Sequence, residues 1–268
     1  MSLAATRYET LSVEIADHIA TITLNRPGQL NALDHQMAKE LLDVAIACDE
    51  APSIRAVIIT GAGDKAFCAG GDLHSFHAKG EDIAAHLKLV THLLHAAISR
   101  FSRMDAPVIA AVNGVAAGAG LSFVGFPDLA IASDQSRFIS AYTASGLTPD
   151  GSSTYFLPRI IGQRRYMELV MTNRMLSADE ALEWGLVNKV TAHDDLMIEA
   201  RQLALSLASG PTKAFGRVKQ MVHQSFNASL EGQMELETQL IAESAKTKDG
   251  LAGVNAFVNK KKPSFTGE

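Results

Sequence analysis

The chain has 268 residues, of which 47% are hydrophobic and 20% are charged, and its formal net charge is −5. This composition excludes an extensively disordered chain and is typical of a globular protein with a core of useful size. A dedicated nucleic-acid-binding protein is also excluded, because the chain has no long basic run with which to neutralise phosphates.

The two cysteines, Cys48 and Cys68, stand in unrelated contexts. They form neither a disulfide framework nor a metal-ligand spacing, which favours a reducing cytoplasm and no metal site. The N-terminus is charged before any long apolar stretch, so we do not expect a signal peptide. Residues 106–127 lack charge over a length that suits a membrane span, but an asparagine, several glycines and two prolines interrupt them. We interpret this segment as a buried strand, a glycine turn and a buried helix.

Short apolar runs alternate with longer helical patterns in the first half of the chain. The alternating run His18–Leu24 predicts a strand that ends at the Asn25–Gly28 turn, and Asp34 then caps a helix that extends to about Asp49. A long helical pattern covers residues 81–104. Nearly all-apolar runs, typical of strands covered on both faces, occur at 55–60, 107–112 and 128–132.

Strands that alternate with helices predict a largely parallel sheet with right-handed crossovers. Beyond about Ile160 the strand patterns fade. We therefore expect an α/β core followed by a helical C-terminal region, with helices near 163–172, 177–184, 194–209, 213–226 and 229–246.

Two glycine-containing loops each connect an apolar strand pattern to a helix. They are Ala66–Leu73, with the sequence AFCAGGDL, and Asn113–Gly120, with the sequence NGVAAGAG. Glycines let a ligand approach the backbone closely and leave N–H groups free to point outward. One N–H group from each loop could hold an oxygen that gains negative charge, as in an oxyanion hole. Taken separately, each loop is better explained as a tight strand-to-helix turn, because a lone glycine pattern is weak evidence for a site.

As a set, the motifs resemble the enoyl-CoA hydratase/isomerase (crotonase) superfamily from Ile22 to the end of the chain. The matching segments are LNRPGQLNALD at 24–34, AFCAGGDL at 66–73, PVIAAVNGVAAGAG at 107–120, GLTPDG at 146–151 and MTNRMLSADEALEWGLV at 171–187. The resemblance implies an α/β, crotonase-like spiral of ββα units over residues 1–200, which carries the acyl-CoA site. It also implies a helical region at 201–268 for trimerisation and for covering coenzyme A. A cytoplasmic homotrimer or dimer of trimers without a cofactor is expected, because coenzyme A is part of the substrate.

The resemblance places the two oxyanion N–H groups on Gly71 and Ala119. An alanine at the second position still donates its N–H group, while its methyl group narrows the floor of the pocket. Contacts with coenzyme A are implied for Arg26, Gln29, Ala32, Ala69, Gly70, Asp72, Leu73, Gly118, Phe257 and Lys260. For the lysine run at 260–262, a solvated tail is the alternative interpretation.

Two positions depart from the hydratase pattern. Where hydratases of this superfamily carry a pair of glutamates, this chain has Ser122 and Tyr142. Because addition of water to a double bond needs a positioned acid and base, hydration by the two-glutamate mechanism is not expected. One carboxylate remains nearby, that of Asp150, which local sequence allows to be either an acid/base or the N-cap of a helix starting near Ser152.

The resemblance gives Asp150 a catalytic role. An aspartate at this place is the acid/base of epoxyphenylacetyl-CoA isomerases and the nucleophile of 4-chlorobenzoyl-CoA dehalogenases. His95, twelve residues before Pro107, matches the histidine that activates water in those dehalogenases, although a helical histidine often has no such role. Tyr142 replaces their tryptophan and is either a ligand contact or a pocket wall.

The leading hypothesis is therefore isomerisation of an unsaturated or aryl-derived acyl-CoA through an enolate, with Asp150 as the single base. The alternatives are hydrolysis with Asp150 as nucleophile, residual hydratase activity, and a coenzyme A-binding homologue without catalysis.

Overall fold

A six-stranded sheet forms the centre of the computed structural model, which describes residues 7–268. Residues 1–6 of the expected core lie outside the described residues. The strand order is β1-β2-β3-β5-β7-β10, and every neighbouring pair is parallel except β1 and β2. These strands are β1 (Leu11–Ala16), β2 (Ile19–Leu24), β3 (Ala56–Gly61), β5 (Val108–Val112), β7 (Leu129–Ser133) and β10 (Lys189–Thr191).

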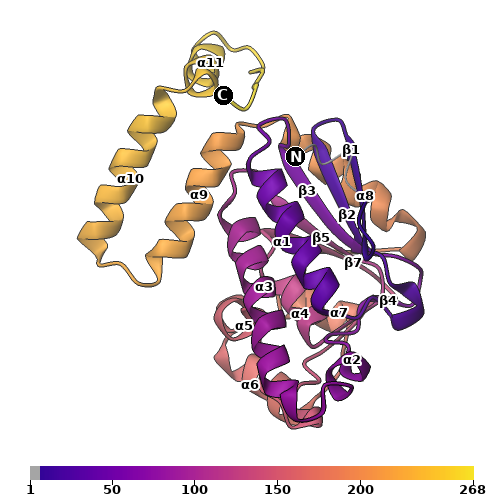
Figure 1. Cartoon of the computed structure of the whole chain (residues 1–268). Coiled ribbons are helices and arrows are strands. Elements are labelled where there is room, and N and C mark those ends of the chain that lie inside the picture. The colour runs from indigo at the N-terminus through magenta and orange to yellow at the C-terminus, as the bar shows by residue number, and fades with distance from the viewer. Residues whose placement is uncertain (1–6) are drawn as a thin grey trace.

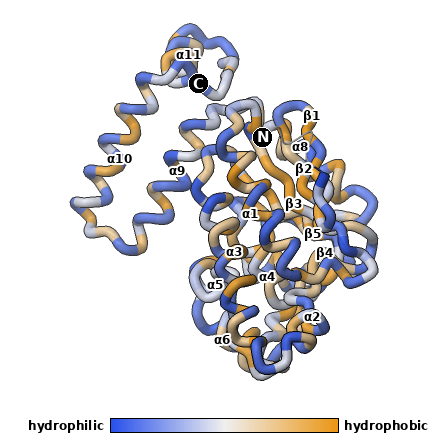
Figure 2. The backbone as a smooth tube through the Cα atoms, in the orientation of Figure 1, coloured by the Kyte–Doolittle hydropathy of each residue, from blue (hydrophilic) through white to orange (hydrophobic). Residues whose placement is uncertain are grey.

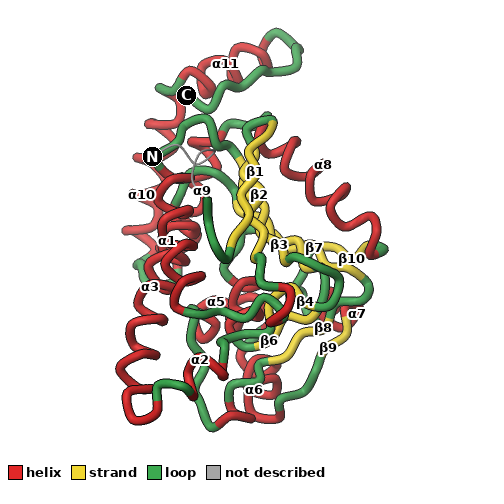
Figure 3. The backbone as a smooth tube through the Cα atoms, turned by 45° about the vertical axis from the view of Figure 1, so that its right-hand side comes forward, coloured by secondary structure: helices red, strands yellow, loops and turns green. Residues whose placement is uncertain are grey.

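Helices cover both faces of this sheet, which explains why its central strands are almost wholly apolar (Figures 1 and 3). In β3, Val57 and Ile59 belong to the core shared with α1 (His35–Asp49) and α3 (Ile83–Arg103). The alternate residues Ala56 and Ile58 pack against α8 (Leu196–Ala208) on the other face. Side chains of a strand point to opposite faces in turn, so both sets of positions must be apolar.

A second, four-stranded sheet lies beside the first in the order β4-β6-β8-β9. Its strands are β4 (Ala66–Cys68), β6 (Val115–Ala117), β8 (Arg137–Ile139) and β9 (Leu176–Ser177). The strands β4, β6 and β8 each follow a strand of the large sheet within a few residues, and β4 and β6 lead into the helices α2 (Leu73–His77) and α4 (Ala119–Gly125). The expected spiral of ββα units is thereby confirmed.

The remaining helices lie around the small sheet or beyond the core. They are η2 (Pro27–Gln29), η3 (Gly80–Asp82), η4 (Thr143–Ser145), α5 (Ser153–Ile161), α6 (Gln163–Thr172), α7 (Ala178–Glu183), η5 (His193–Asp195), α9 (Thr212–Ser225), α10 (Leu230–Ala245) and α11 (Lys248–Val258). Figure 1 shows α10 and α11 projecting away from the core as an arm. The boundary expected at residue 200 falls inside α8, which packs on the large sheet.

Hydropathy follows this arrangement (Figure 2): the central strands β3 and β5 are apolar, whereas the projecting arm carries polar and apolar residues side by side. The uncharged segment 106–127 forms β5, β6 and α4 inside the core, as the sequence analysis expected. In the described part of the chain, no helix is long and apolar enough to cross a membrane.

Most predicted elements are present, including the strands near 18–24, 55–60, 107–112 and 128–132 and the helices after residue 160. Although the strand patterns fade beyond about Ile160, two short strands, β9 and β10, follow it. Both are at most three residues long, which is too short to leave a periodic pattern in the sequence.

Candidate active site

The two glycine-containing loops lie against each other at the edge of the small sheet. Gly70 and Gly118 both have positive φ, at 98° and 52°. A Cβ atom built on Gly70 would lie 3.0 Å from the carbonyl oxygen of Ala117 and 3.4 Å from Cα of Gly118. Only glycine combines this backbone conformation with so close an approach. The loop after β4 and the loop after β6 are therefore locked together at these residues.

Gly71 follows Gly70 and directs its N–H group away from the neighbouring chain. Leu33 donates its N–H group to the Gly70 carbonyl at 2.7 Å and accepts one from Asp72 at 2.8 Å. Because successive backbone groups of an extended chain point to opposite sides, the N–H group of Gly71 faces away from Leu33. Ala119 is the first residue of α4, where an N–H group has no acceptor inside the helix. Between residues 7 and 268, neither N–H group has a hydrogen-bond acceptor.

Both residues line one largely apolar cavity of about 240 Å³. Leu33, Phe76, Leu87 and Val90 supply apolar walls, and Tyr142 and Asp150 supply polar groups. Asp150 is the one carboxylate among the described residues that line this cavity. Its size, its mostly apolar lining and its few convergent polar groups are those of a small-molecule site.

Tyr142 donates a hydrogen bond from its hydroxyl group to Oδ1 of Asp150 at 2.5 Å. Burial raises the pKa of the Asp150 carboxyl group above its ordinary value, although the hydrogen bond that Tyr142 donates acts in the opposite direction. Burial, together with the charge of Asp150, also raises the pKa of Tyr142, so its hydroxyl group remains a donor. A carboxylate whose basicity is increased in this way suits proton transfer near neutral pH.

The N-cap interpretation of Asp150 is wrong. Ser152, not Asp150, precedes the first residue of α5, and that helix has no side-chain cap. Asp150 contributes only its backbone carbonyl, which accepts the N–H group of Ser153 at 3.1 Å. Its carboxyl group is therefore free of the helix and lines the cavity instead.

The peptide bond between Asp150 and Gly151 contacts two helices. Ser122 in α4 donates its hydroxyl group to the Asp150 carbonyl at 3.0 Å, and Nε2 of His95 in α3 accepts the Gly151 N–H group at 3.1 Å. Gly151 has a φ of 58°, and a Cβ atom there would lie 2.9 Å from Ser122. Ser122, predicted only as the place of a missing glutamate, thus contacts the turn that carries Asp150.

A second, wider and more polar groove of about 970 Å³ lies between α3, α5 and α9. Asp150 borders this groove as well as the apolar cavity, and His95, Ser152 and His223 line it. His95 is an exposed residue. Asp150 therefore lies between the apolar cavity, which suits an apolar group of a ligand, and the polar groove, which admits water.

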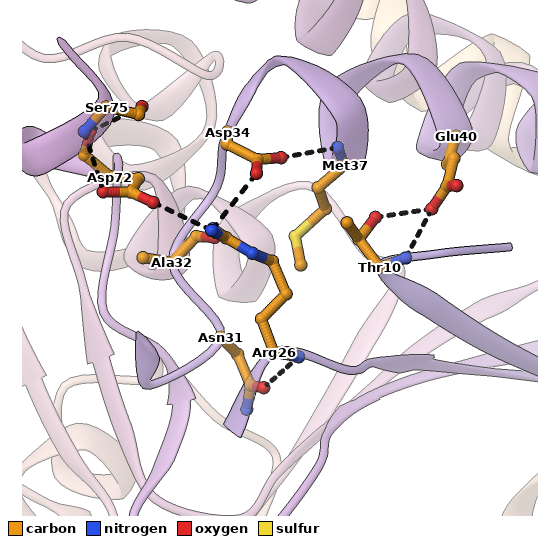
Figure 4. Close-up of polar contacts among 9 residues, drawn as sticks. All are labelled: Thr10, Arg26, Asn31, Ala32, Asp34, Met37, Glu40, Asp72 and Ser75. Carbon is orange, nitrogen blue, oxygen red and sulfur yellow. Dashed lines mark hydrogen bonds and ion pairs between the residues drawn. The ribbon is translucent and has the colours of Figure 1, made fainter. Parts of the chain in front are cut away.

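Arg26 is already bound to two carboxylates (Figure 4). Its Nη2 lies 3.2 Å from Asp34 and 2.9 Å from Asp72, and its Nη1 donates to the Ala32 carbonyl at 2.5 Å. Although burial opposes it, hydrogen bonds from Ser75 and from Arg26 hold the pKa of Asp72 below its ordinary value. The Arg26 guanidinium thus ties the caps of α1 and α2 together, and its charge is compensated within the chain.

The other predicted coenzyme A contacts fall into two groups. One group lines the apolar cavity and consists of Ala69, Gly70, Leu73 and Gly118. Gln29 does not line this cavity and is exposed in η2. Phe257 lies in α11 and Lys260 follows the end of that helix, and Figure 1 shows α11 far from α2. The fold of one chain does not bring these last two residues to the site.

Sequence reasoning missed Asn31, which is fully buried and donates to the carbonyls of Ala62 and Ala66 at 2.9 and 2.8 Å. It joins the first turn to the strand that leads into the Gly70 loop. Its only sequence signal was its place within the LNALD motif. Leu147 and Thr148, which also line the cavity, lie within the GLTPDG motif at 146–151, whereas Thr91 had no distinguishing signal.

Comparison with known proteins gives a consistent result. Residues 14–268 match the family described as enoyl-CoA hydratase/isomerase. The chain is 36% identical over 251 residues to 1,2-epoxyphenylacetyl-CoA isomerase of Escherichia coli strain K12, covering 93% of this chain and 95% of that protein. It is 37% identical over 235 residues to 4-chlorobenzoyl coenzyme A dehalogenase-1 of an Arthrobacter species, covering 87% and 85%. The crystal structure of an enoyl-CoA hydratase from Bacillus anthracis superposes with a TM-score of 0.91 at 33% identity, covering 97% and 100%.

Proposed function

The chain belongs to the enoyl-CoA hydratase/isomerase family, and we propose that within this family it is an isomerase that moves a double bond in an acyl-CoA thioester. The observation that carries the proposal is the set of functional groups that line the apolar cavity. Among the described residues, the N–H groups of Gly71 and Ala119 have no acceptor and lie in one cavity with a single carboxylate, that of Asp150. This set suits proton removal and return next to a carbonyl group, without a second acid or base.

The two N–H groups would hold the thioester oxygen. Removal of a proton from the carbon beside the thioester places negative charge on that oxygen, and two donors stabilise the resulting enolate. A single oxyanion donor contributes about 10²- to 10³-fold in rate. Asp150 takes the proton from one carbon and delivers it to another, so the chain is unchanged after each turnover.

Hydration is less well supported by the same geometry. At the two glutamate positions, the hydroxyl groups of Ser122 and Tyr142 are both hydrogen-bonded to Asp150. Neither side chain is a carboxylate, and the pKa of Tyr142 is raised rather than lowered. Water addition by two carboxylates therefore lacks its second participant.

The arm would complete the site in an oligomer. Apolar side chains are strongly exposed on it, and Phe257 is 85% exposed. Exposed apolar surface of this kind marks an interaction site. In a homotrimer or dimer of trimers, Phe257 and Lys260 would reach coenzyme A on a neighbouring subunit. This assembly accounts for the exposed apolar arm and for the distance of these two residues from the site of their own chain. Sedimentation velocity tests it, and a monomer at micromolar concentration would reject it.

The activity test uses a substrate panel with wild type and Asp150→Asn. The panel contains crotonyl-CoA, a 3-enoyl-CoA, an arylacetyl-derived epoxide-CoA and 4-chlorobenzoyl-CoA, followed by absorbance and mass. We expect mass-neutral conversion that Asp150→Asn abolishes, with acyl-CoA binding retained. A gain of water on crotonyl-CoA, or full activity of Asp150→Asn, would reject the proposal.

Hydrolysis is the second candidate, because Asp150 and His95 both border the polar groove through which water could arrive. In that reaction the carboxylate attacks the substrate, and water then hydrolyses the ester. Single-turnover mass spectrometry would find an ester on Asp150, together with released chloride from 4-chlorobenzoyl-CoA. The absence of any covalent adduct during turnover excludes this candidate.

A further inference from the structure

We propose that His95 and Ser122 are positioning residues that clamp the peptide bond after Asp150 and so aim its carboxyl group into the apolar cavity. This inference rests on the proposed role of Asp150 as the base. It assigns to His95 the role of a hydrogen-bond acceptor, rather than the role of activating water.

The two contacts hold opposite ends of one peptide unit. Ser122 donates to its carbonyl oxygen at 3.0 Å, and Nε2 of His95 accepts from its N–H group at 3.1 Å. The side chains come from different helices, α4 and α3, on either side of the turn. Since a peptide unit is planar, fixing both polar atoms fixes its plane, and with it the ψ of Asp150 and the φ of Gly151.

The surroundings leave this peptide little freedom. Ser122 is only 1% exposed, and a Cβ atom on Gly151 would lie 2.9 Å from Ser122 and 3.6 Å from Leu94. Gly151 also holds a positive φ that side chains disfavour. The backbone of Asp150 is thus set by α3 and α4, while Tyr142 sets the orientation of its carboxyl group. Three separate elements hold one carboxylate, as a pre-organised base requires.

The direction of the His95 hydrogen bond decides which role its ring can take. A backbone N–H group can only donate, so Nε2 of His95 accepts, and the ring carries its proton on Nδ1. The lone pair of Nε2 is therefore occupied by Gly151 and is not available to take a proton from water. A histidine that activated water through this nitrogen would have to release the turn that carries Asp150.

The test compares four variants in the mass-neutral isomerisation assay: His95→Ala, His95→Gln, Ser122→Ala and the control His92→Ala. His92 lies in the same helix and is exposed. In His95→Gln, the side-chain carbonyl oxygen reaches about as far as Nε2 and can accept the Gly151 N–H group, but it cannot act as a base.

We expect His95→Ala and Ser122→Ala each to lower kcat by about 10- to 100-fold with little change in KM, because displacing a reacting group by about 1 Å costs that much. His95→Gln should recover most of the lost rate, and His92→Ala should match wild type. Thermal melting of each variant establishes that it is folded. A His95→Gln variant as slow as His95→Ala, or wild-type kcat in both alanine variants, would overturn the clamp.

A second measurement does not depend on activity. The nitrogen-15 spectrum of histidine-labelled protein reports which ring nitrogen of His95 carries the proton, and we expect Nδ1. A proton on Nε2 of neutral His95 would overturn the clamp. Full activity of Asp150→Asn, by contrast, would reject the isomerase proposal itself, so the two failures are distinguishable.

Discussion

Gly120→Ala tests whether the contact between the two loops sets the oxyanion geometry. A Cβ atom on Gly120 would lie 2.0 Å from the carbonyl oxygen of Cys68, whereas real Cβ atoms essentially never approach closer than 3.0 Å. The obstacle is backbone and cannot rotate away, so α4 and β4 must separate by at least about 1 Å. Gly71 and Ala119 lie on opposite sides of this contact, and their N–H groups would move apart.

The expected result is a fall in kcat of about 100-fold, since a displacement of about 1 Å has that effect on a positioned group. Overpacking should also destabilise the fold by about 1–3 kcal/mol. The assay is mass-neutral turnover together with urea unfolding. Gly28→Ala is the matched control, because a Cβ atom on Gly28 meets nothing within 4 Å and its φ is not positive.

Ala119→Gly serves as a second control at the site. It keeps the backbone N–H group, removes a methyl group from the cavity floor, and should cost about 0.5–1 kcal/mol of stability with activity largely retained. Wild-type kcat and stability in Gly120→Ala would refute the reasoning, because they would show that the loops tolerate separation. Loss of activity in Gly28→Ala would show that the assay reports general damage.

Three further predictions follow from buried groups. Burial raises the pKa of Cys48 and of Cys68 to about 12, so neither thiol should react with a disulfide reagent at pH 8 until the protein is unfolded; fast native labelling would contradict this. Burial raises the pKa of Asp150, so its contribution to stability is present below the unfolded carboxyl pKa and is lost as pH rises through the folded pKa. Asp150→Asn should therefore melt at a higher temperature than wild type at pH 7, and the difference should disappear near pH 3; the opposite order at pH 7 would reject the raised pKa. Lys219, 7% exposed, pairs with Asp128 at 2.8 Å and donates to the carbonyls of Phe101 and Ala106, so Lys219→Met should cost about 1–3 kcal/mol in urea unfolding by leaving those carbonyls unpaired; no measurable loss would show that Lys219 is not a link between α9 and the core.

The sequence by itself determined the layered α/β core and the positions of the two glycine-containing loops. Short, fully apolar runs such as 107–112 are typical of strands covered on both faces, and this pattern is visible in the local sequence. Gly70 and Gly118 adopt conformations that other residues disfavour, so glycine itself indicates the turns. The departures at Ser122 and Tyr142 were also visible, because each concerns a residue type at one position.

Only the tertiary structure decided what these residues contact. Ser122 and His95 are 28 and 56 residues from the peptide that they share, and no local pattern encodes which side chains meet across such distances. Arg26 was predicted to contact coenzyme A, and only the fold shows that Asp34 and Asp72 lie beside its guanidinium group. The choice between the two interpretations of Asp150 also needed the fold. Local sequence makes an aspartate before a helix a good N-cap. In the structure, the packing of α3 and α4 around its turn directs this carboxyl group into the cavity instead.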